Sequence, residues 1–337
     1  MTTRGGGEAN AGNGRREDSP SSGHRILFPT DFSPHAAAAW PYAVSLARRR
    51  GAALHVLHVV TPPVFGAGPE AAMVAGPMID DVLAEAHGVL DALAETARAL
   101  AVEVRTHTRV GDAASEITAC ATAEGIDQIV MATTGRTGVA HALMGSVAER
   151  VVRHAACPVL TVRHDPKVAP APVTPDALPR IRQILVPLDG SPLAEAALPG
   201  IIGVATRQGA SVRLLRVVHA HALRPVDLEA AQVRCVQGAE AYLASVEGRL
   251  RAAGLASTAA VRYGEAAAEI LDDIHVNRPD LVAMSTHGRT GLLHLVLGSV
   301  AEQVLRASSV PVLLFPARAV HAGHPAAAHP LPSRASQ

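Results

Sequence analysis

Aromatic residues, cysteines and long apolar runs are all scarce in this sequence. Phe, Trp and Tyr make up only 2% of the 337 residues, although hydrophobic residues make up 48%. The core therefore has to be built from Ala, Val, Leu and Ile, a composition that suits helices stacked on a buried parallel sheet. A single core rarely grows beyond about 250–300 residues, so the length indicates two domains.

The other absences exclude whole classes of protein. The three cysteines, Cys120, Cys157 and Cys235, form no C-x-x-C pair, which argues against a disulfide framework and a cysteine zinc site. Lys+Arg and Asp+Glu are equal at 30 each, so no excess of positive charge indicates nucleic-acid binding. No run of about 18 apolar residues is present, and residues 1–23 lack the apolar stretch of a secretory signal. We therefore expect a soluble cytoplasmic protein without nucleic-acid or membrane partners.

What the sequence does contain is an internal repeat. Residues 26–34 match 184–192 at an offset of 158, and residues 135–149 match 288–302 at an offset of 153. Two constant offsets indicate one insertion or deletion, of five residues (158 − 153), between the matched segments. We expect two copies of one domain, a Pro-rich linker between them and disordered tails. The boundaries are 1–23 (tail), 24–163 (copy one), 164–180 (linker), 181–316 (copy two) and 317–337 (tail).

Within each copy, strand-like and helix-like segments alternate. In copy one the expected strands lie at 26–28, 54–60, 102–110, 126–131 and 158–162, and the expected helices begin at Pro34, after a Ser33 cap, and span 77–100 and 112–124. This alternation predicts an α/β fold in which right-handed crossovers build a parallel sheet. The short apolar segments 158–162 and 311–315 end the two copies, so we expect them to be sheet edges that pair with each other.

Two segments of unusual composition lie directly after expected strands, where doubly wound sheets bind their ligands. Asp31 follows the first strand of copy one, and Asp189 follows that of copy two. A Gly-containing loop follows the fourth strand, at 133–138 and 286–291. Backbone N–H groups at such a loop, and at the N-terminus of the helix after it, can bind phosphate.

Each of these features also has a purely structural interpretation. Asp31 can be a turn residue, and Ser146 with Glu149 fits a capping box that needs no ligand. The arginine of each G-R-T-G segment can pair with phosphate or face solvent. The H-x-G-H sequence at 321–324 lies in the expected tail and is set aside. The 17 histidines show no ligand spacing supported by carboxylates or cysteines, so we expect no metal site.

The repeated loop resembles that of the universal stress protein family, in a tandem two-domain form. Family members that hold ATP carry G-x2-G-x9-G-[ST] after the fourth strand, and both copies match the second half of this motif. Ala132 and Ser285 stand in place of its first glycine, where a glycine permits close approach of the backbone to the ligand. The resemblance covers about 26–163 and 184–316. It implies two doubly wound five-stranded domains with strand order 3-2-1-4-5, of the adenine nucleotide alpha hydrolase type.

The resemblance also implies a nucleotide site in each copy. An aspartate would contact the nucleotide near its ribose, the backbone of the second strand would meet the adenine, and the glycines and serine would hold ribose and phosphates. The residues so implied are Asp31, Val59, Gly135, Gly145 and Ser146 in copy one and Asp189, Val217, Gly288, Gly298 and Ser299 in copy two.

By this resemblance the protein is an ATP-binding regulator of the stress response, with or without Mg²⁺, whose domains pair within the chain and which can form a further homodimer. No catalytic base, arginine finger or carboxylate pair is identifiable, so we expect no catalytic residues and no enzyme. The alternatives are an interaction module that binds no nucleotide and a slow ATPase. We expect copy two to be the better site, because Gly190 leaves space that Phe32 fills in copy one.

Overall fold

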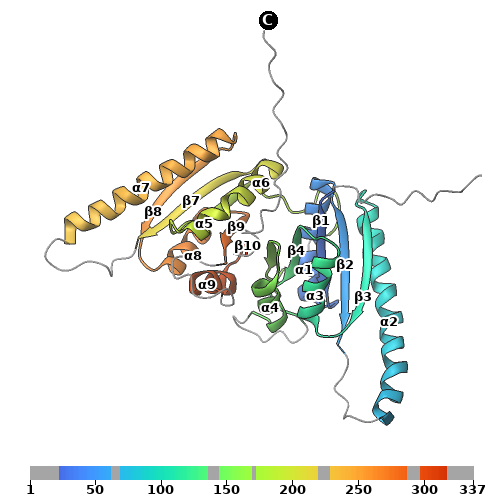
Figure 1. Cartoon of the computed structure of the whole chain (residues 1–337). Helices are drawn as coiled ribbons and strands as arrows, with labels where there is room; N and C mark the ends of the chain where they lie inside the picture. Colours follow the sequence, from blue (N-terminus) through green and yellow to red (C-terminus); the bar gives the residue numbers. More distant parts are fainter. Residues whose placement is uncertain are drawn as a thin grey trace, which may run out of the picture.

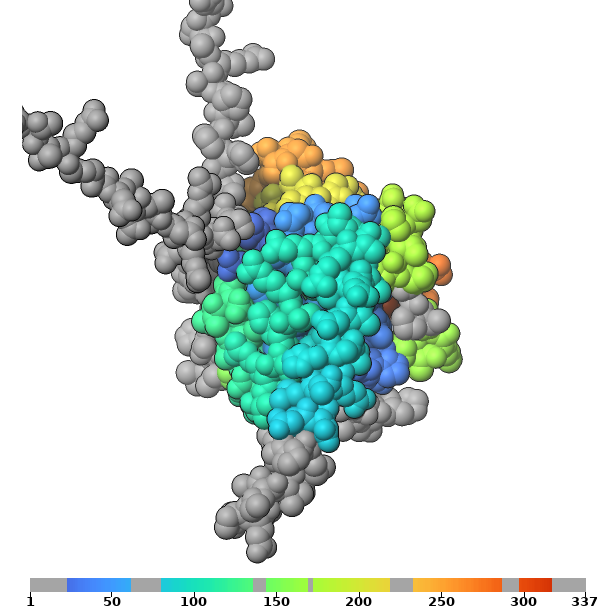
Figure 2. Space-filling view, turned by 90° about the vertical axis from the view of Figure 1, so that its right-hand side faces the viewer, coloured from blue at the N-terminus to red at the C-terminus, as the bar shows by residue number. Residues whose placement is uncertain are grey.

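The computed structural model describes residues 23–61, 69–135, 144–168, 172–218, 228–286 and 297–316, and the side chains of its two longest helices from residues 80 and 233 onward. Among these residues, ten strands form one continuous sheet in the order β3-β2-β1-β4-β5-β10-β9-β6-β7-β8. In Figure 1, β3 and α2 lie at one end of the molecule, and β8 and α7 lie at the other. Figure 2 looks onto the first of these ends, where the cyan residues of α2 face the viewer and copy two lies behind.

The elements of copy one follow the expected alternation. They are β1 (Arg25–Thr30), α1 (Pro34–Arg50), β2 (Ala53–Val60), α2 (Pro69–Arg98), β3 (Val104–Val110), α3 (Ala113–Ala123), β4 (Gln128–Ala132), α4 (Ser146–His154) and β5 (Val159–Val162). The expected strand starts at 102 and 126 were two residues early, and α2 begins eight residues before the expected 77. Ser33 caps α1 as expected, since its side chain accepts a hydrogen bond from the N–H of Ala36.

Copy two repeats this order with one difference. Its elements are β6 (Gln183–Pro187), α5 (Pro192–Ala196), α6 (Leu198–Gln208), β7 (Ser211–Val218), α7 (Leu228–Ala252), β8 (Ser257–Tyr263), α8 (Ala266–Asn277), β9 (Leu281–Ser285), α9 (Ser299–Ala307) and β10 (Val312–Phe315). The single helix α1 is therefore matched by the pair α5 and α6. Pro199, in the first turn of α6, has no N–H to continue the helix, although Pro41 at the matching position lies inside the unbroken α1. The five-residue difference between the copies lies in the long helix, which has 30 residues in α2 and 25 in α7.

The two copies are joined at the centre of the sheet. Within each copy the strands are parallel and follow the order 3-2-1-4-5, which is the doubly wound α/β fold predicted from the sequence. β5 and β10 lie antiparallel, with Leu160 opposite Leu313 and Thr161 opposite Val312. The buried Thr161 hydroxyl also donates a hydrogen bond to the carbonyl of Val312, at 3.1 Å. The two short apolar edge strands thus cover each other.

Helices cover both faces of the sheet, and each face has its own buried cluster. On one face, α1 and α2 of copy one and α5, α6 and α7 of copy two pack on the strands. On the other face, α3 and α4 and their counterparts α8 and α9 do the same. Both clusters run across the β5–β10 junction, and nearly all their members are Ala, Val, Leu or Ile. Burial on both faces explains why central strands such as β5 and β10 are buried at every residue, whereas the outer strands β3 and β8 carry polar, partly exposed residues. Among the described helices, none combines the length and the hydropathy needed to cross a bilayer.

Candidate functional site

A cavity of about 550 Å³ opens at the carboxyl ends of β1, β2 and β4 in copy one. This volume is in the range of small-molecule sites, about 300–1,000 Å³. The cavity brings together residues that are far apart in the sequence. All five site residues expected for copy one line it, namely Asp31, Val59, Gly135, Gly145 and Ser146. Apolar side chains form much of its remaining wall, and they include Leu57, Ile117, Met131 and Val147.

Asp31 and Gly135 lie against each other at the mouth of this cavity. One carboxylate oxygen of Asp31 accepts hydrogen bonds from the N–H and the hydroxyl of Ser33, at 3.1 and 2.6 Å. A Cβ atom on Gly135 would lie 2.7 Å from the other oxygen, Oδ2. Asp31 is therefore a turn residue, as the structural interpretation holds, and it also faces the loop after β4. Gly135 is required for space, since it is not among the described glycines with positive φ.

The N-terminus of α4 faces the cavity without a side-chain cap. Gly145 is the N-cap and Ser146 is the first helical residue, and no side chain accepts a hydrogen bond at this end. The alternative, structural interpretation of Ser146 as the start of a capping box is therefore wrong, because its hydroxyl lies one position too late to cap the helix. Glu149 instead pairs with Arg153 one turn further along. The first N–H groups of α4 are left for water or for an anion.

The sequence analysis missed a packed group at the end of β1. Phe32 has a φ of 62°, which is costly for a residue with a bulky side chain. Its ring stacks on His58, with centroids 4.2 Å apart, and its N–H donates to the Thr30 hydroxyl. Nδ1 of His58 lies 2.8 Å from the carbonyl oxygen of Thr30. The signal was present in the repeat, because Gly190, with a φ of 73°, occupies the matching position in copy two.

Copy two differs at this same point. A Cβ atom on Gly190 would lie 2.6 Å from a guanidinium nitrogen of Arg216, the counterpart of His58. The same nitrogen lies 3.4 Å from the carbonyl oxygen of Leu188, and the guanidinium lies over the ring of Tyr242. The expectation that Gly190 leaves free space in copy two is therefore wrong, since Arg216 fills it.

The described site residues of copy two occupy the same places in their elements as those of copy one. Asp189 accepts a hydrogen bond from the N–H of Ser191 at 2.9 Å, as Asp31 does from Ser33. Gly298 is the N-cap of α9 without a side-chain cap, and Ser299 is the first helical residue. Val217 lies in β7. Gly288, His287 and the two G-R-T-G arginines, Arg136 and Arg289, lie outside the described residues.

Sequence and structure comparisons agree with this architecture. The family model described as "Universal stress protein family" matches residues 23–163 and 180–316. Universal stress protein Rv2005c of Mycobacterium tuberculosis is 32% identical over 200 residues, which are 56% of this chain and 61% of that protein. The match therefore spans less than two thirds of this relative. Universal stress protein Rv1996 of the same species is 26% identical over 319 residues, 86% of this chain and 94% of that protein.

The fold has a solved counterpart of the same two-domain size. The crystal structure of a universal stress protein from Archaeoglobus fulgidus has a TM-score of 0.63 and 23% sequence identity, and the match covers 87% of this chain and 98% of that one. At this identity the likeness concerns the fold alone. The family model, however, matches both copies and so most of the chain. The chain belongs to the universal stress protein family.

Proposed function

We propose that copy one binds ATP in the cavity between β1, β2, β4 and α4, and that the protein is a non-catalytic, ATP-dependent regulator. The observation that carries the proposal is the N-terminus of α4, which has Gly145 as its N-cap and no side-chain cap, beside a cavity of about 550 Å³. The partial positive charge of a helix N-terminus and its unpaired N–H groups favour a phosphate group. The apolar wall would hold the base, and the Asp31 carboxylate would accept hydrogen bonds from ribose hydroxyls.

The charges around the cavity favour binding over hydrolysis. Among the described residues that line it, Asp31 is the only carboxylate, and there is no lysine or arginine. Phosphoryl transfer needs positioned cations, and a residue that orients the attacking nucleophile. One carboxylate beside backbone N–H groups supplies a binding site but not this machinery. ATP occupancy would then regulate contacts with other proteins.

The substitution Ser146→Asp tests the proposal without weakening the helix. Ser146 is exposed at the first position of α4, where a negative charge interacts favourably with the helix dipole. The same charge would repel phosphate. Ser299→Asp places the same change at the matching position of α9 in copy two and is the matched control.

The measurement is calorimetric titration with ATP and with GTP. We expect the unmodified protein to bind ATP more tightly than GTP, in the micromolar range, without fast release of ADP. Ser146→Asp should weaken ATP binding at least tenfold, and Ser299→Asp should change it less. No binding at millimolar ATP, or equal affinity in the unmodified protein and Ser146→Asp, would refute nucleotide binding at this site. The first outcome would favour an interaction module that binds no nucleotide, and the second would place ATP elsewhere in the chain.

A further inference from the structure

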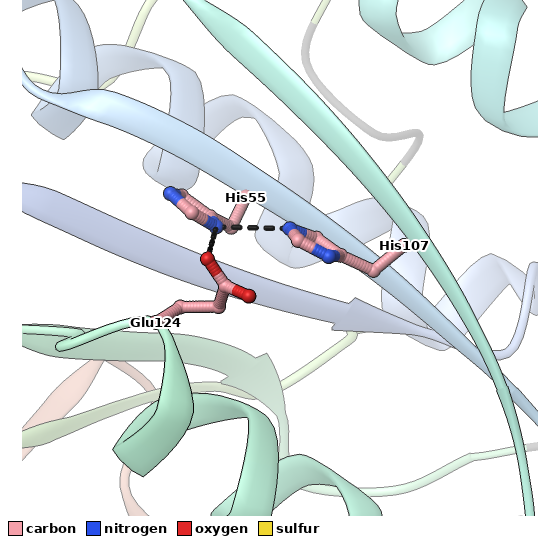
Figure 3. A group of neighbouring side chains, drawn as sticks. All are labelled: His55, His107 and Glu124. Atoms are coloured by element: carbon pink, nitrogen blue, oxygen red, sulfur yellow. Dashed lines mark hydrogen bonds and ion pairs between the residues drawn. The ribbon is translucent and has the colours of Figure 1, made fainter. Parts of the chain in front are cut away.

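Three side chains of metal-binding type meet in copy one, near the amino end of β2 and away from the cavity. His55 comes from β2, His107 from β3, and Glu124 from the residue that ends α3 (Figure 3). Nδ1 of His55 lies 2.9 Å from Nε2 of His107 and 3.9 Å from Oε2 of Glu124. All three atoms lie within 4.8 Å of one another.

The two imidazole rings are arranged edge to edge. Their planes differ by 8° and their centroids are 5.0 Å apart, so a separation of 2.9 Å between the nearest nitrogens places both nitrogens in the space between the rings. Without a cation there, one nitrogen has to carry a proton and donate it to the other. Nε2 of His55 is buried and has no hydrogen-bond partner among the described residues. A cation bound at Nδ1 of His55 would leave the proton on Nε2 of the same ring, so a cation is indicated only by the atoms that face each other, Nδ1 of His55 and Nε2 of His107.

Both histidines are held in the form that binds metals. Burial is the main cause that lowers the pKa of His55 to about 4, and the neighbouring His107 lowers it further. Burial also lowers the pKa of His107. Both imidazoles are therefore neutral at pH 7, with a lone pair available. The surrounding charges are Glu124, which favours a cation, and Arg25, Arg105 and Arg109, which oppose one.

We propose that His55, His107 and Glu124 form a zinc site in copy one. A point equidistant from the three ligand atoms lies at most about 2.4 Å from each, and Zn²⁺ binds histidine nitrogen and carboxylate oxygen at about 2.0–2.2 Å. Shifts of about 0.3 Å would therefore complete the coordination. Two imidazoles and one carboxylate suit Zn²⁺ and leave a fourth position for water. The side chain of Glu124 is 31% exposed, so solvent reaches this position.

The matching positions in copy two carry no set of metal-binding side chains. The counterparts of His55, His107 and Glu124 are Arg213, Ala260 and Asn277. Arg213 forms two hydrogen bonds of 2.8 Å with the buried Asp273, and Asn277 donates to that carboxylate at 3.0 Å. An ion pair therefore fills the space in copy two and satisfies its polar atoms. Copy one lacks the ion pair and has two imidazoles and a carboxylate instead.

The test compares three variants of the full chain. His107→Ala introduces the residue that copy two carries, and Glu124→Gln removes the charge while keeping the size of a half-exposed side chain. His87→Ala is the control, because His87 is exposed on α2. Zinc binding is measured by competition with a chromophoric chelator, and Co²⁺ serves as a visible probe of tetrahedral coordination. The other histidines, among them those at 321–324, add the same background to every protein.

We expect both site variants to bind zinc at least tenfold more weakly than the unmodified protein and to lose the tetrahedral Co²⁺ absorption. His87→Ala should keep both properties. Circular dichroism checks that each variant is folded, and Glu124→Gln decides the matter if His107→Ala unfolds. Unchanged zinc affinity in folded Glu124→Gln, or the absence of tetrahedral Co²⁺ absorption in the unmodified protein, would overturn the proposal. The site lies away from the ATP cavity, so either outcome leaves the proposed ATP binding unaffected.

Discussion

Gly135→Ala is the smallest change that tests how the cavity of copy one is built. The added Cβ would lie 2.7 Å from Oδ2 of Asp31, closer than a carbon and an oxygen approach each other without a bond. The carboxylate cannot swing away freely, because its other oxygen accepts two hydrogen bonds from Ser33. Ser33 in turn caps α1. Either these hydrogen bonds lengthen, or the loop after β4 moves.

The magnitude follows from the bonds at risk. A hydrogen bond to a charged group contributes about 1.5–3 kcal/mol, and Asp31 is partly exposed, which reduces that value. We therefore expect Gly135→Ala to lower the free energy of unfolding of copy one by about 1–2 kcal/mol. If the displaced carboxylate is the one that meets the ribose, ATP affinity should fall by a similar free energy, roughly tenfold.

The assay uses the fact that the chain has one tryptophan. Trp40 lies in α1, is 5% exposed and packs against Phe28, so its fluorescence during urea denaturation reports on copy one. A double-mutant cycle with Asp31→Ala isolates the contact, because Gly135→Ala should cost little once the carboxylate is absent. Gly88→Ala is the control, since a Cβ there meets nothing within 4 Å, and it should stabilise the α2 helix. An equal cost of Gly135→Ala with and without Asp31 would refute the steric argument.

The remaining predictions concern pH, thiol reactivity and strand pairing. The folded pKa of His55, about 4, is below its ordinary value of about 6.5, so on acidification the unfolded chain binds a proton at a higher pH than the folded chain does. The free energy of unfolding of copy one should therefore fall by up to about 3 kcal/mol as the pH falls from 6.5 to 4. Urea titrations of the zinc-free protein check this loss, and a curve equally steep in His55→Leu would contradict it. Iodoacetamide at pH 8 should label only the exposed Cys235 in the folded protein and all three cysteines in denaturant. Cys120 and Cys157 are buried, and burial raises the pKa of the Cys157 thiol to about 12. Mass spectrometry counts the labels, and a second label on the folded chain would contradict the prediction. Leu160→Cys with Leu313→Cys, which face each other across β5 and β10, should form a disulfide within one chain, and disulfide-linked dimers on a non-reducing gel would show instead that these strands pair between chains.

Much of the fold could be predicted from the sequence, because the repeat supplied two independent copies of each signal. The alternation of apolar strands and Ala-rich helices was sufficient for the parallel sheet in each copy. Prolines gave less information, since Pro41 lies inside α1 while the matching Pro199 stands where copy two has two helices. A proline at one matched position therefore does not by itself decide whether the helix is continuous.

The arrangement at the proposed nucleotide site could be predicted only in part. Asp31 and Gly135 were both identified, but their contact depends on β1 and β4 lying side by side. The S-x-x-E pattern pointed to Ser146 as the N-cap, whereas the N-cap is Gly145 and Ser146 is the first helical residue. A pattern of residue types does not fix where a helix starts when a glycine precedes it, because glycine itself is acceptable at the N-cap.

The histidine cluster could not be found by spacing at all. His55 and His107 are 52 residues apart and meet only because β2 and β3 pair, with His107 opposite Leu57, two residues beyond His55. Adjacent parallel strands place such residues on the same face. Glu124 comes from the end of a helix that packs on this face. A search for short metal-binding motifs therefore does not find these residues. The expectation of no metal site came from such a search, which considers only residues close together in the sequence.

The second strand of each copy shows how the two copies have diverged. In β2, His55 lies at the proposed zinc site and His58 lines the cavity proposed to bind ATP. In β7 the same two positions are Arg213 and Arg216. One arginine forms the ion pair with Asp273, and the other fills the space beside Gly190. A guanidinium is larger than an imidazole and always charged, so Arg213 replaces a proposed zinc ligand with a fixed ion pair. Copy two therefore fills both places with arginine contacts, while copy one has His55 at the proposed zinc site and His58 stacked on Phe32 beside the proposed ATP cavity.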